Sequence, residues 1–485
     1  MILRTAVIVF FAVFLGSLPG YASPWAGPGD TQLRSDVEVL AGFGLISGPT
    51  NNWPMSWKQI TGNFYKADGM DLPSYVRAAL RRVKDKVPNE INVKAKAYYT
   101  SEVDFFRGFG DTARGEGEIE STLEYNLENT SVNLNARYDS NRESLNLDGS
   151  YISQEIGNWS AYVGSVERWW GPGKETTTLI STNARPIPSI GIRRVEPKAF
   201  ETKWLSWIGP WQGDIFISKL EKNRHIASPV FIGMKLAFEP VNNLEIGLAR
   251  SLMLCGEGRV CNFKSWVNGL VGFGDLDNIG PSELQPGNQL AQIDVSYSFK
   301  AGENVNAKIY AEGSAEDLLV VLPYTYSRIL GASFYGPIGE NGDAWRVTAE
   351  ASDTTGSLAW LYGEHRRGIM YNHGVYRDGY RYFDKVIGHS LDSNSIYYSL
   401  EAVITRSNGW ELGFKYQNIV VNTDDNDRNR LSLSRERINS FNVNVIAITE
   451  LGKIKLDARV MDNNINTPLE DKFNIRGAIN WEIGF

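Results

Sequence analysis

The C-terminal segment, residues 473–485, reads Phe-Asn-Ile-Arg-Gly-Ala-Ile-Asn-Trp-Glu-Ile-Gly-Phe, and its apolar residues alternate with small or polar ones without a break. Because successive side chains of a β-strand point to opposite faces, this segment offers one face to an apolar environment and the other to water. It also ends on an aromatic residue, Phe485. This ending is typical of the last strand of a bacterial outer-membrane barrel, so the segment predicts a membrane-spanning β-barrel.

The N-terminal residues have the pattern of an export signal. Arg4 precedes an uncharged apolar run, Ala6–Leu18, and small residues precede an expected cleavage before Ser23. The run of 13 residues is shorter than the roughly 20 that a spanning helix needs, which disfavours a retained anchor. We therefore predict a signal peptide, residues 1–22, and a mature chain in the outer membrane of a Gram-negative bacterium.

The charge balance excludes one class of partner. Removal of residues 1–22 takes away a single charge, that of Arg4, and leaves 48 basic and 56 acidic residues. A chain with net negative charge argues against nucleic acid as a partner, and an acidic ligand needs local arginines to hold it. The 14 Trp, 22 Tyr, 21 Phe and 47 Gly suit many strands with tight turns and aromatic girdles at the membrane surface.

Two cysteines, Cys255 and Cys261, lie close together in a glycine-rich stretch. In an oxidising compartment they predict a disulfide that closes a small loop. A metal site made of the two thiolates alone is disfavoured, because no histidine lies near them in sequence. We expect neither a metal ion nor a cofactor.

Residues 30–87 follow a different period from the rest of the chain. Apolar residues recur there every three or four positions, which is helical spacing, and Pro73 marks one helix start. We expect three short helices in a periplasmic α-helical bundle, residues 23–88, followed by the barrel, residues 89–485. The basic residues of the last helix indicate a solvated face, with docking to polysaccharide export machinery or to lipid head groups as the alternative.

From Ile91 onward the period changes to two, and apolar residues alternate with Asn, Lys, Asp and Arg. The charged face must be wet, although a β-sandwich would show the same alternation. Short and long gaps separate the predicted strands in turn, as in outer-membrane barrels. We count 18 or 19 strands, because residues 343–364 form either one bent strand or a hairpin. Both chain ends belong on the periplasmic side, with Phe485 at that rim, so we predict an all-β membrane protein with an 18-stranded antiparallel barrel.

Two long outward loops, residues 168–199 and 365–394, are dense in aromatic rings, amides and guanidiniums. Sugar rings stack their C–H faces on Trp and Tyr, and their hydroxyls need Asn, Asp, Arg and His partners. Arginine adds bidentate recognition of a carboxylate, such as that of a uronic acid. The candidate polysaccharide-binding residues are Trp169, Trp170, Asn183, Arg185, Arg193, Arg194, Tyr371, His373, Tyr376, Tyr380, Arg381 and Tyr382.

The same side chains also fit a purely structural role. They can fold a long loop into the lumen and seal it, paired with inward Glu and Asp side chains of the strands. For each residue taken singly, this packing role is favoured over a sugar contact. For the stretch from Tyr371 to Tyr382 the balance favours sugar, because its density of aromatic and His side chains exceeds what one plug contact needs.

The motifs of these loops carry a resemblance to a known family. Residues 168–173 read Arg-Trp-Trp-Gly-Pro-Gly, and residues 183–188 read Asn-Ala-Arg-Pro-Ile-Pro. Downstream lie Tyr-Asn-His-Gly-Val-Tyr-x-Asp-Gly-Tyr-Arg-Tyr at 371–382 and Ile-Gly-His-Ser at 387–390. In this order they resemble the Wzi family of capsule-assembly outer-membrane proteins, over essentially the whole mature chain. The resemblance implies an 18-stranded barrel with a small helical bundle beneath it, a blocked lumen, and a lectin that helps to hold exported capsular polysaccharide at the cell surface.

Enzymes, metal sites and pores are the rival functions. His389 and Ser390 are adjacent, but a catalytic triad needs groups that separate elements position, so we expect no catalytic residues. Residues 422–427 offer oxygen ligands for Ca²⁺ but lack the Gly and the distal Glu of an EF-hand loop, which favours a solvated tip. Charged inward residues leave a porin or a substrate-specific channel as the alternative to an occluded lectin of capsular polysaccharide or exopolysaccharide.

Overall fold

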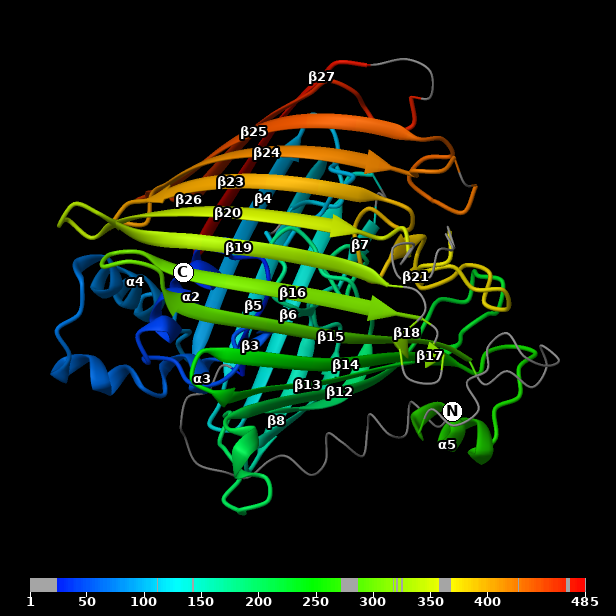
Figure 1. Cartoon of the computed structure of the whole chain (residues 1–485), viewed down its shortest axis with the longest axis horizontal. Helices are drawn as coiled ribbons and strands as arrows, with labels where there is room; N and C mark the ends of the chain where they lie inside the picture. The colour runs from blue at the N-terminus through cyan, green and yellow to red at the C-terminus, as the bar shows by residue number, and fades with distance from the viewer. Residues whose placement is uncertain are drawn as a thin grey trace.

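The structure, a computed structural model, describes residues 24–484 except 111, 142–143, 272–286, 317, 320–321, 324–325, 357–367, 426 and 468–471. Its long strands close into one antiparallel barrel (Figure 1). The predicted signal peptide and the terminal Phe485 lie outside the described residues. No helix in the described part of the chain has both the length and the apolar character to cross a membrane.

The barrel wall contains 18 strands, as the sequence predicted. Two short segments, β7 and β8, both pair with β6 and count as one interrupted strand. The wall segments are β4 (Ile91–Thr100), β5 (Gly117–Asn126), β6 (Thr130–Asp139), β7 (Ser144–Asn146), β8 (Tyr151–Ile156), β9 (Trp159–Gly164), β11 (Ser189–Arg194), β12 (Trp211–Lys219), β13 (Val230–Val241), β14 (Leu244–Leu254), β15 (Gly287–Lys300), β16 (Asn306–Ala315), β19 (Ser327–Ile338), β20 (Asp343–Asp353), β23 (Ile396–Thr405), β24 (Glu411–Val421), β25 (Glu436–Thr449), β26 (Gly452–Met461) and β27 (Asn474–Gly484).

The last strand closes the barrel by pairing with the first. β27 runs antiparallel to β4, and Glu482 lies opposite Lys96 in the register. Ile475 and Ile479 on β27 are exposed on the outer surface, whereas Arg476 between them is buried toward the lumen. The alternation of residues 473–485 therefore sets which side chains face inward.

Most helices lie at one end of the barrel, which we call the helical end (Figure 1, left). They are α2 (Thr31–Gly42), α3 (Trp57–Thr61), the 3₁₀ helix η1 (Phe64–Gly69) and α4 (Ser74–Lys84). Asp30 caps α2, because its carboxylate accepts the Leu33 N–H at 2.9 Å. An ion pair between Arg82 and Asp36, at 2.6 Å, joins α4 to α2.

The opposite end, which we call the loop end, carries two small hairpins and one further helix (Figure 1, right). These are β17 (Leu318–Leu319) with β18 (Leu322–Pro323), β21 (Arg381–Tyr382) with β22 (Lys385–Val386), and α5 (Phe263–Val271). β20 ends at Asp353, and most of the remainder of the ambiguous 343–364 stretch lies outside the described residues.

Residues 165–188 form a lumen plug that meets the helices inside the barrel. The plug segment β10 (Trp169–Trp170) pairs with β2 (Asn52–Trp53), while β1 (Trp25–Ala26) pairs with β3 (Met55–Ser56). The Arg34 guanidinium of α2 donates to the carbonyls of Pro172 and Gly173, at 2.8 and 2.9 Å. The plug and the helical bundle therefore form one packed unit.

The structure corrects the prediction that residues 168–199 form one outward loop. Residues up to 188 enter the lumen, β11 is a wall strand, and residues 195–210, with η2 (Ser206–Ile208), join β11 to β12 at the helical end. The alternation of β11 places Ile190 and Ile192 on the outer surface. This strand is short, and its neighbouring prolines and arginines obscured it in the sequence.

Candidate functional site

The two tryptophans of the plug are packing groups. Both Trp169 and Trp170 are fully buried. Trp169 donates its indole N–H to the Gly173 carbonyl at 3.1 Å and meets the edge of the Phe109 ring, with 5.4 Å between ring centres. Trp170 packs on Phe216 of β12, with 5.7 Å between ring centres. Both rings fix the plug between the bundle and the wall.

Inward carboxylates of the strands hold the plug backbone. Glu312 on β16 accepts the hydroxyls of Thr177 and Thr178, each at 2.7 Å. Glu350 on β20 accepts the backbone N–H groups of Lys174, at 2.6 Å, and of Glu175, at 3.1 Å. These carboxylates therefore hold the plug through its threonines and its backbone, and not through the candidate side chains that the sequence analysis paired with them.

Arg193 and Arg194 lie apart from the other candidates. Both are on β11 toward the helical end, where Arg194 lies opposite Trp159 in the register. Arg193 is buried and forms an ion pair with Asp214 at 3.4 Å. The Arg194 guanidinium stacks on the Trp211 ring at 3.7 Å. The structure thus corrects their placement in one loop with Trp169.

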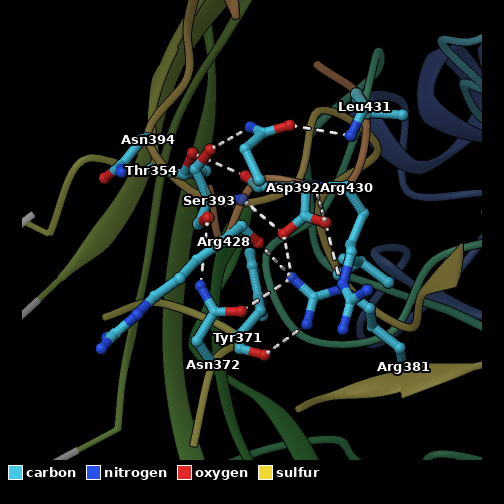
Figure 2. A network of polar contacts seen from close by, with 12 residues as sticks. Thr354, Tyr371, Asn372, Arg381, Asp392, Ser393, Asn394, Arg428, Arg430 and Leu431 are labelled. Carbon is cyan, nitrogen blue, oxygen red and sulfur yellow. Dashed lines mark hydrogen bonds and ion pairs between the residues drawn. The ribbon is translucent and has the colours of Figure 1, made fainter. Parts of the chain in front are cut away.

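Arg381 is the centre of the loop that covers the plug, residues 368–395 (Figure 2). Its Nε and Nη2 atoms donate to the Asp392 carboxylate at 3.0 and 2.6 Å. It also donates to the Tyr371 carbonyl at 3.1 Å and to Asn372 Oδ1 at 3.0 Å. The side chain is 2% exposed, so its donors serve the loop itself.

Three tyrosines of the same loop are also buried. Tyr371 donates its hydroxyl to the Thr178 carbonyl of the plug at 2.6 Å. Tyr376 donates to the carbonyl of Cys255, at 3.0 Å, and Cys255 forms a disulfide with Cys261. The Tyr380 ring packs on Phe231 of β13, with 5.7 Å between ring centres. The loop is therefore tied to the plug, to the disulfide-closed turn and to the wall.

Two histidines of this loop accept hydrogen bonds from the backbone. His373 Nδ1 accepts the N–H groups of Val375 and Tyr376, at 3.1 and 3.0 Å, and His389 Nδ1 accepts that of Leu391 at 3.1 Å. Burial lowers the pKa of His373 to about 4 and that of His389 to about 3. Both rings are therefore neutral at pH 7 and act as acceptors.

One candidate remains accessible where the plug meets the outer hairpin. The Arg185 guanidinium is held by the Asp148 carboxylate at 2.6 and 2.9 Å and lies 5.6 Å from the Phe383 ring centre. Tyr382 meets Phe383 edge-on at 4.6 Å, and burial raises the pKa of Tyr382 to about 12. We call Arg185, Asp148, Tyr382 and Phe383 the loop-end patch.

Phe383 is the most exposed member of the loop-end patch, at 45%. It occupies the turn between β21 and β22 with Asp384, and the two residues have φ values of 47° and 60°. Positive φ is strained for a bulky residue, and such strain often marks a functional position. Asn183 braces the hairpin from the plug, because its side-chain amide donates to the Val386 carbonyl at 2.9 Å.

The sequence did not single out Phe383 or Asp148. Phe383 and Asp384 form the two-residue turn between β21 and β22, and only the shortness of this stretch could have indicated a turn there. The partnership of Asp148 with Arg185 joins residues 37 positions apart and has no local signal. The site candidates thus divide into a buried group that builds the plug and its cover, two arginines on β11 toward the helical end, and a group around Arg185 whose exposed surface is mainly that of Phe383.

The described residues offer little for catalysis or metal binding. His389 Nε2 contacts Ser352 Oγ at 2.6 Å, but both side chains are buried. Ser390 Oγ instead donates to the Arg107 carbonyl at 2.5 Å. Within the described part of the chain, no group of three or more His, Cys, Asp and Glu side chains is arranged to hold a metal ion.

Comparisons with known proteins agree with this architecture. A model of the family described as capsule assembly protein Wzi matches residues 86–473. A Klebsiella pneumoniae protein described as an uncharacterized 55.8 kDa protein in the cps region is 28% identical over 365 residues, which cover 73% of this chain and 70% of that protein. A solved Escherichia coli structure, described as Wzi, an outer-membrane protein involved in group 1 capsule assembly and a carbohydrate-binding β-barrel, has a TM-score of 0.81 and 22% identity. The match covers 96% of this chain and 100% of the solved chain, so the two share one fold.

Proposed function

Because this chain belongs to the Wzi family of capsule assembly proteins, we propose that it is a non-enzymatic outer-membrane lectin. It binds capsular polysaccharide or exopolysaccharide and helps to attach the polymer at the cell surface. The solved Escherichia coli relative is described as carbohydrate-binding, which supports this role. The observation that carries the proposal is the loop-end patch, where an accessible aromatic ring stands beside a fixed guanidinium and carboxylate.

The chemistry of the loop-end patch suits a sugar ring. Phe383 presents an apolar ring face on which the C–H face of a pyranose can stack. Arg185 and Asp148 supply donors and an acceptor for hydroxyls beside that ring. Since Asp148 already neutralises Arg185, the patch favours neutral hydroxyl-rich contacts over strong binding of a bare anion.

The orientation of the barrel in the membrane follows from this role. A surface polymer is reached only from outside the cell, so the loop end is extracellular and the helical bundle, residues 23–88, is periplasmic. In this orientation, the bundle at the helical end is available to polysaccharide export machinery. The outward-facing apolar side chains of the wall, such as Ile475 and Leu248, contact outer-membrane lipid.

The porin alternative is less consistent with the lumen. Trp169 and Trp170 of the plug are buried, and the strand carboxylates Glu312 and Glu350 hold the plug against one side of the wall. A water-filled pore instead leaves inward residues solvated. The plug therefore favours a closed lectin over a channel.

Polysaccharide binding tests this proposal. Purified protein is immobilised and exposed to capsular polysaccharide from the bacterium that makes this chain, and binding is followed by surface plasmon resonance. We expect Phe383→Ala to weaken binding about two- to tenfold, because a stacking contact contributes about 0.5–1.5 kcal/mol and 1.4 kcal/mol is a factor of ten. Leu433→Ala, which changes another exposed loop-end side chain, is the matched control. Equal binding by both variants and wild type would place the polymer contact elsewhere, and no binding by wild type would reject the lectin.

A further inference from the structure

Helix α5 lies outside the barrel, against the outer face of the wall at the loop end (Figure 1). Trp266 of α5 packs on Ile232, Leu252 and Leu254, which β13 and β14 present outward. Gly269 permits the close approach, because an added Cβ would lie 3.1 Å from a Leu252 methyl carbon. This part of the wall is thus covered by the helix.

Arg250, an outward-facing residue of β14, fixes the position of α5 along the barrel axis. Inward-facing Ala249 and Ser251 flank it and are buried, while Leu248 on its outward row is 44% exposed. The Arg250 guanidinium donates to the carbonyls of Gly269 and Leu270 at 2.7 and 2.8 Å. These are last-turn carbonyls of α5, which a cation satisfies well.

A cation on the lipid-facing row is costly unless its donors are satisfied, most of all at the bilayer centre and less near the surface. The contact between Arg250 and the α5 carbonyls satisfies two of these donors and lowers that cost. It also places the C-terminal turn of the helix beside Arg250 on β14. The next outward residue of that strand is the exposed Leu248.

The remaining face of α5 is apolar and uncovered. Phe263, Val267 and Leu270 are 84%, 39% and 44% exposed. They lie four and three residues apart and so form one stripe along the helix. Lys264 is exposed at the edge of this face, about 100° around the axis from Phe263 and about 60° from Val267. We call Phe263, Val267 and Leu270 the α5 stripe.

We propose that α5 is a membrane-surface helix whose stripe contacts lipid hydrocarbon in the leaflet at the loop end. The stripe continues the lipid-facing apolar surface of β13 and β14, and Lys264 lies where the helix meets water. An amphipathic helix in the plane of a membrane surface has this division of faces. The disulfide Cys255–Cys261 ends two residues before the helix and holds its start close to β14.

Spin labels on the full-length protein test the position of the stripe. Val267→Cys and Lys264→Cys are labelled with a nitroxide in the absence of reductant, which leaves the native disulfide closed, and are reconstituted into phosphatidylcholine vesicles. Lys222→Cys, an exposed loop-end position, is the aqueous reference. Heat-modifiable migration in gels verifies that each labelled barrel is folded. Power saturation then measures collisions of each label with oxygen and with a water-soluble nickel chelate.

We expect the label at 267 to lose access to nickel and gain collisions with oxygen relative to the labels at 264 and 222. Equal nickel access at 267 and 264 would overturn the proposal, because the stripe would then face water. Spin–spin broadening at 267 with protection from both reagents would also overturn it, because a second copy of the chain would cover the stripe. A misfolded Val267→Cys protein is replaced by Leu270→Cys, which lies on the same stripe and is read in the same way.

Discussion

Arg381 shows how a motif dense in basic and aromatic groups can be structural. Its guanidinium is 2% exposed and forms a two-pronged contact with Asp392. Replacing it by Leu leaves the buried carboxylate without this partner, a change that costs about 3–5 kcal/mol when a buried ion pair is broken. We expect Arg381→Leu to retain a heat-resistant barrel but to expose residues 368–395 to limited proteolysis, followed by mass spectrometry of the fragments.

Arg381→Lys refines this test. Lysine keeps the charge but lacks the planar fork that reaches Asp392, Asn372 and the Tyr371 carbonyl together, so we expect cleavage here also. Arg377, four positions earlier and exposed, supplies the control Arg377→Leu, which is cleaved at the wild-type rate. Wild-type resistance in Arg381→Leu would show that other contacts hold the loop.

The sequence revealed the residue types of the candidate site but not their exposure. The aromatic density from Tyr371 to Tyr382 favoured sugar contacts, yet Tyr371, Tyr376 and Tyr380 are at most 1% exposed. Burial depends on partners far along the chain, such as the Thr178 carbonyl 193 residues from Tyr371. Type and spacing within one motif do not contain that information.

At the scale of elements, residues 368–395 contain a pH-sensitive pair of turns. His373 and His389 each accept backbone N–H groups through Nδ1, and burial lowers both pKa values, to about 4 and about 3. Above pH 6.5 both the folded and the opened loop hold neutral rings. As the pH falls below 6.5 the opened loop binds protons that the folded loop does not, so the closed loop loses stability until the folded pKa values are passed.

Hydrogen exchange with mass spectrometry measures this effect. After correction for intrinsic exchange rates, we expect amides of residues 368–395 to lose protection between pH 7.5 and pH 4, while the strands keep theirs. His389→Gln removes one of the two titrating rings and should reduce the response to the part that His373 contributes, whereas His225→Gln, at an exposed loop-end position, should leave it unchanged. Protection that is constant with pH in wild type would contradict the role of these rings.

The strands were predictable because each carries its own signal. Alternation of period two on β27 gave the inward and outward faces directly, and Arg476 and Ile479 lie as expected. β11 and the 195–210 connection were missed, since the strand has six residues and is flanked by a plug rather than by turn residues. The conformation of a segment that folds into a lumen is determined by contacts with other elements. It has no regular spacing of apolar residues from which it could be predicted.

At the scale of the whole molecule, the lumen is filled unevenly. The plug occupies the side lined by β12 to β20, where Asp214, Ser314 and Ser333 are fully buried. The side lined by β4, β26 and β27 keeps a cavity of about 540 Å³ at the helical end and a neighbouring one of about 150 Å³. Both cavities are lined by Lys455 and Asn480.

The segment between β4 and β5, residues 101–116, closes this side of the lumen toward the loop end. Phe106 packs on Tyr397 with 5.4 Å between ring centres, within an apolar cluster that includes Ile438 and Met461. Asp104 anchors the segment, since its carboxylate pairs with Arg459 at 2.9 Å and Arg476 at 2.5 Å. The closure thus rests on an apolar cluster and on one carboxylate, Asp104, beside the cavity.

Planar-bilayer recording of the full-length protein tests that closure. We expect wild type to show no stable open-pore current, and Asp104→Ala to show intermittent currents because the 101–116 segment loses its anchor. Those currents should favour anions, since the variant leaves Arg459 and Arg476 beside a cavity that Lys455 also lines. Asp462→Ala, which alters an exposed carboxylate that contacts Asn439, should remain closed. Stable currents from wild type would instead support the channel alternative, and silence of Asp104→Ala would show that the apolar cluster alone seals this side.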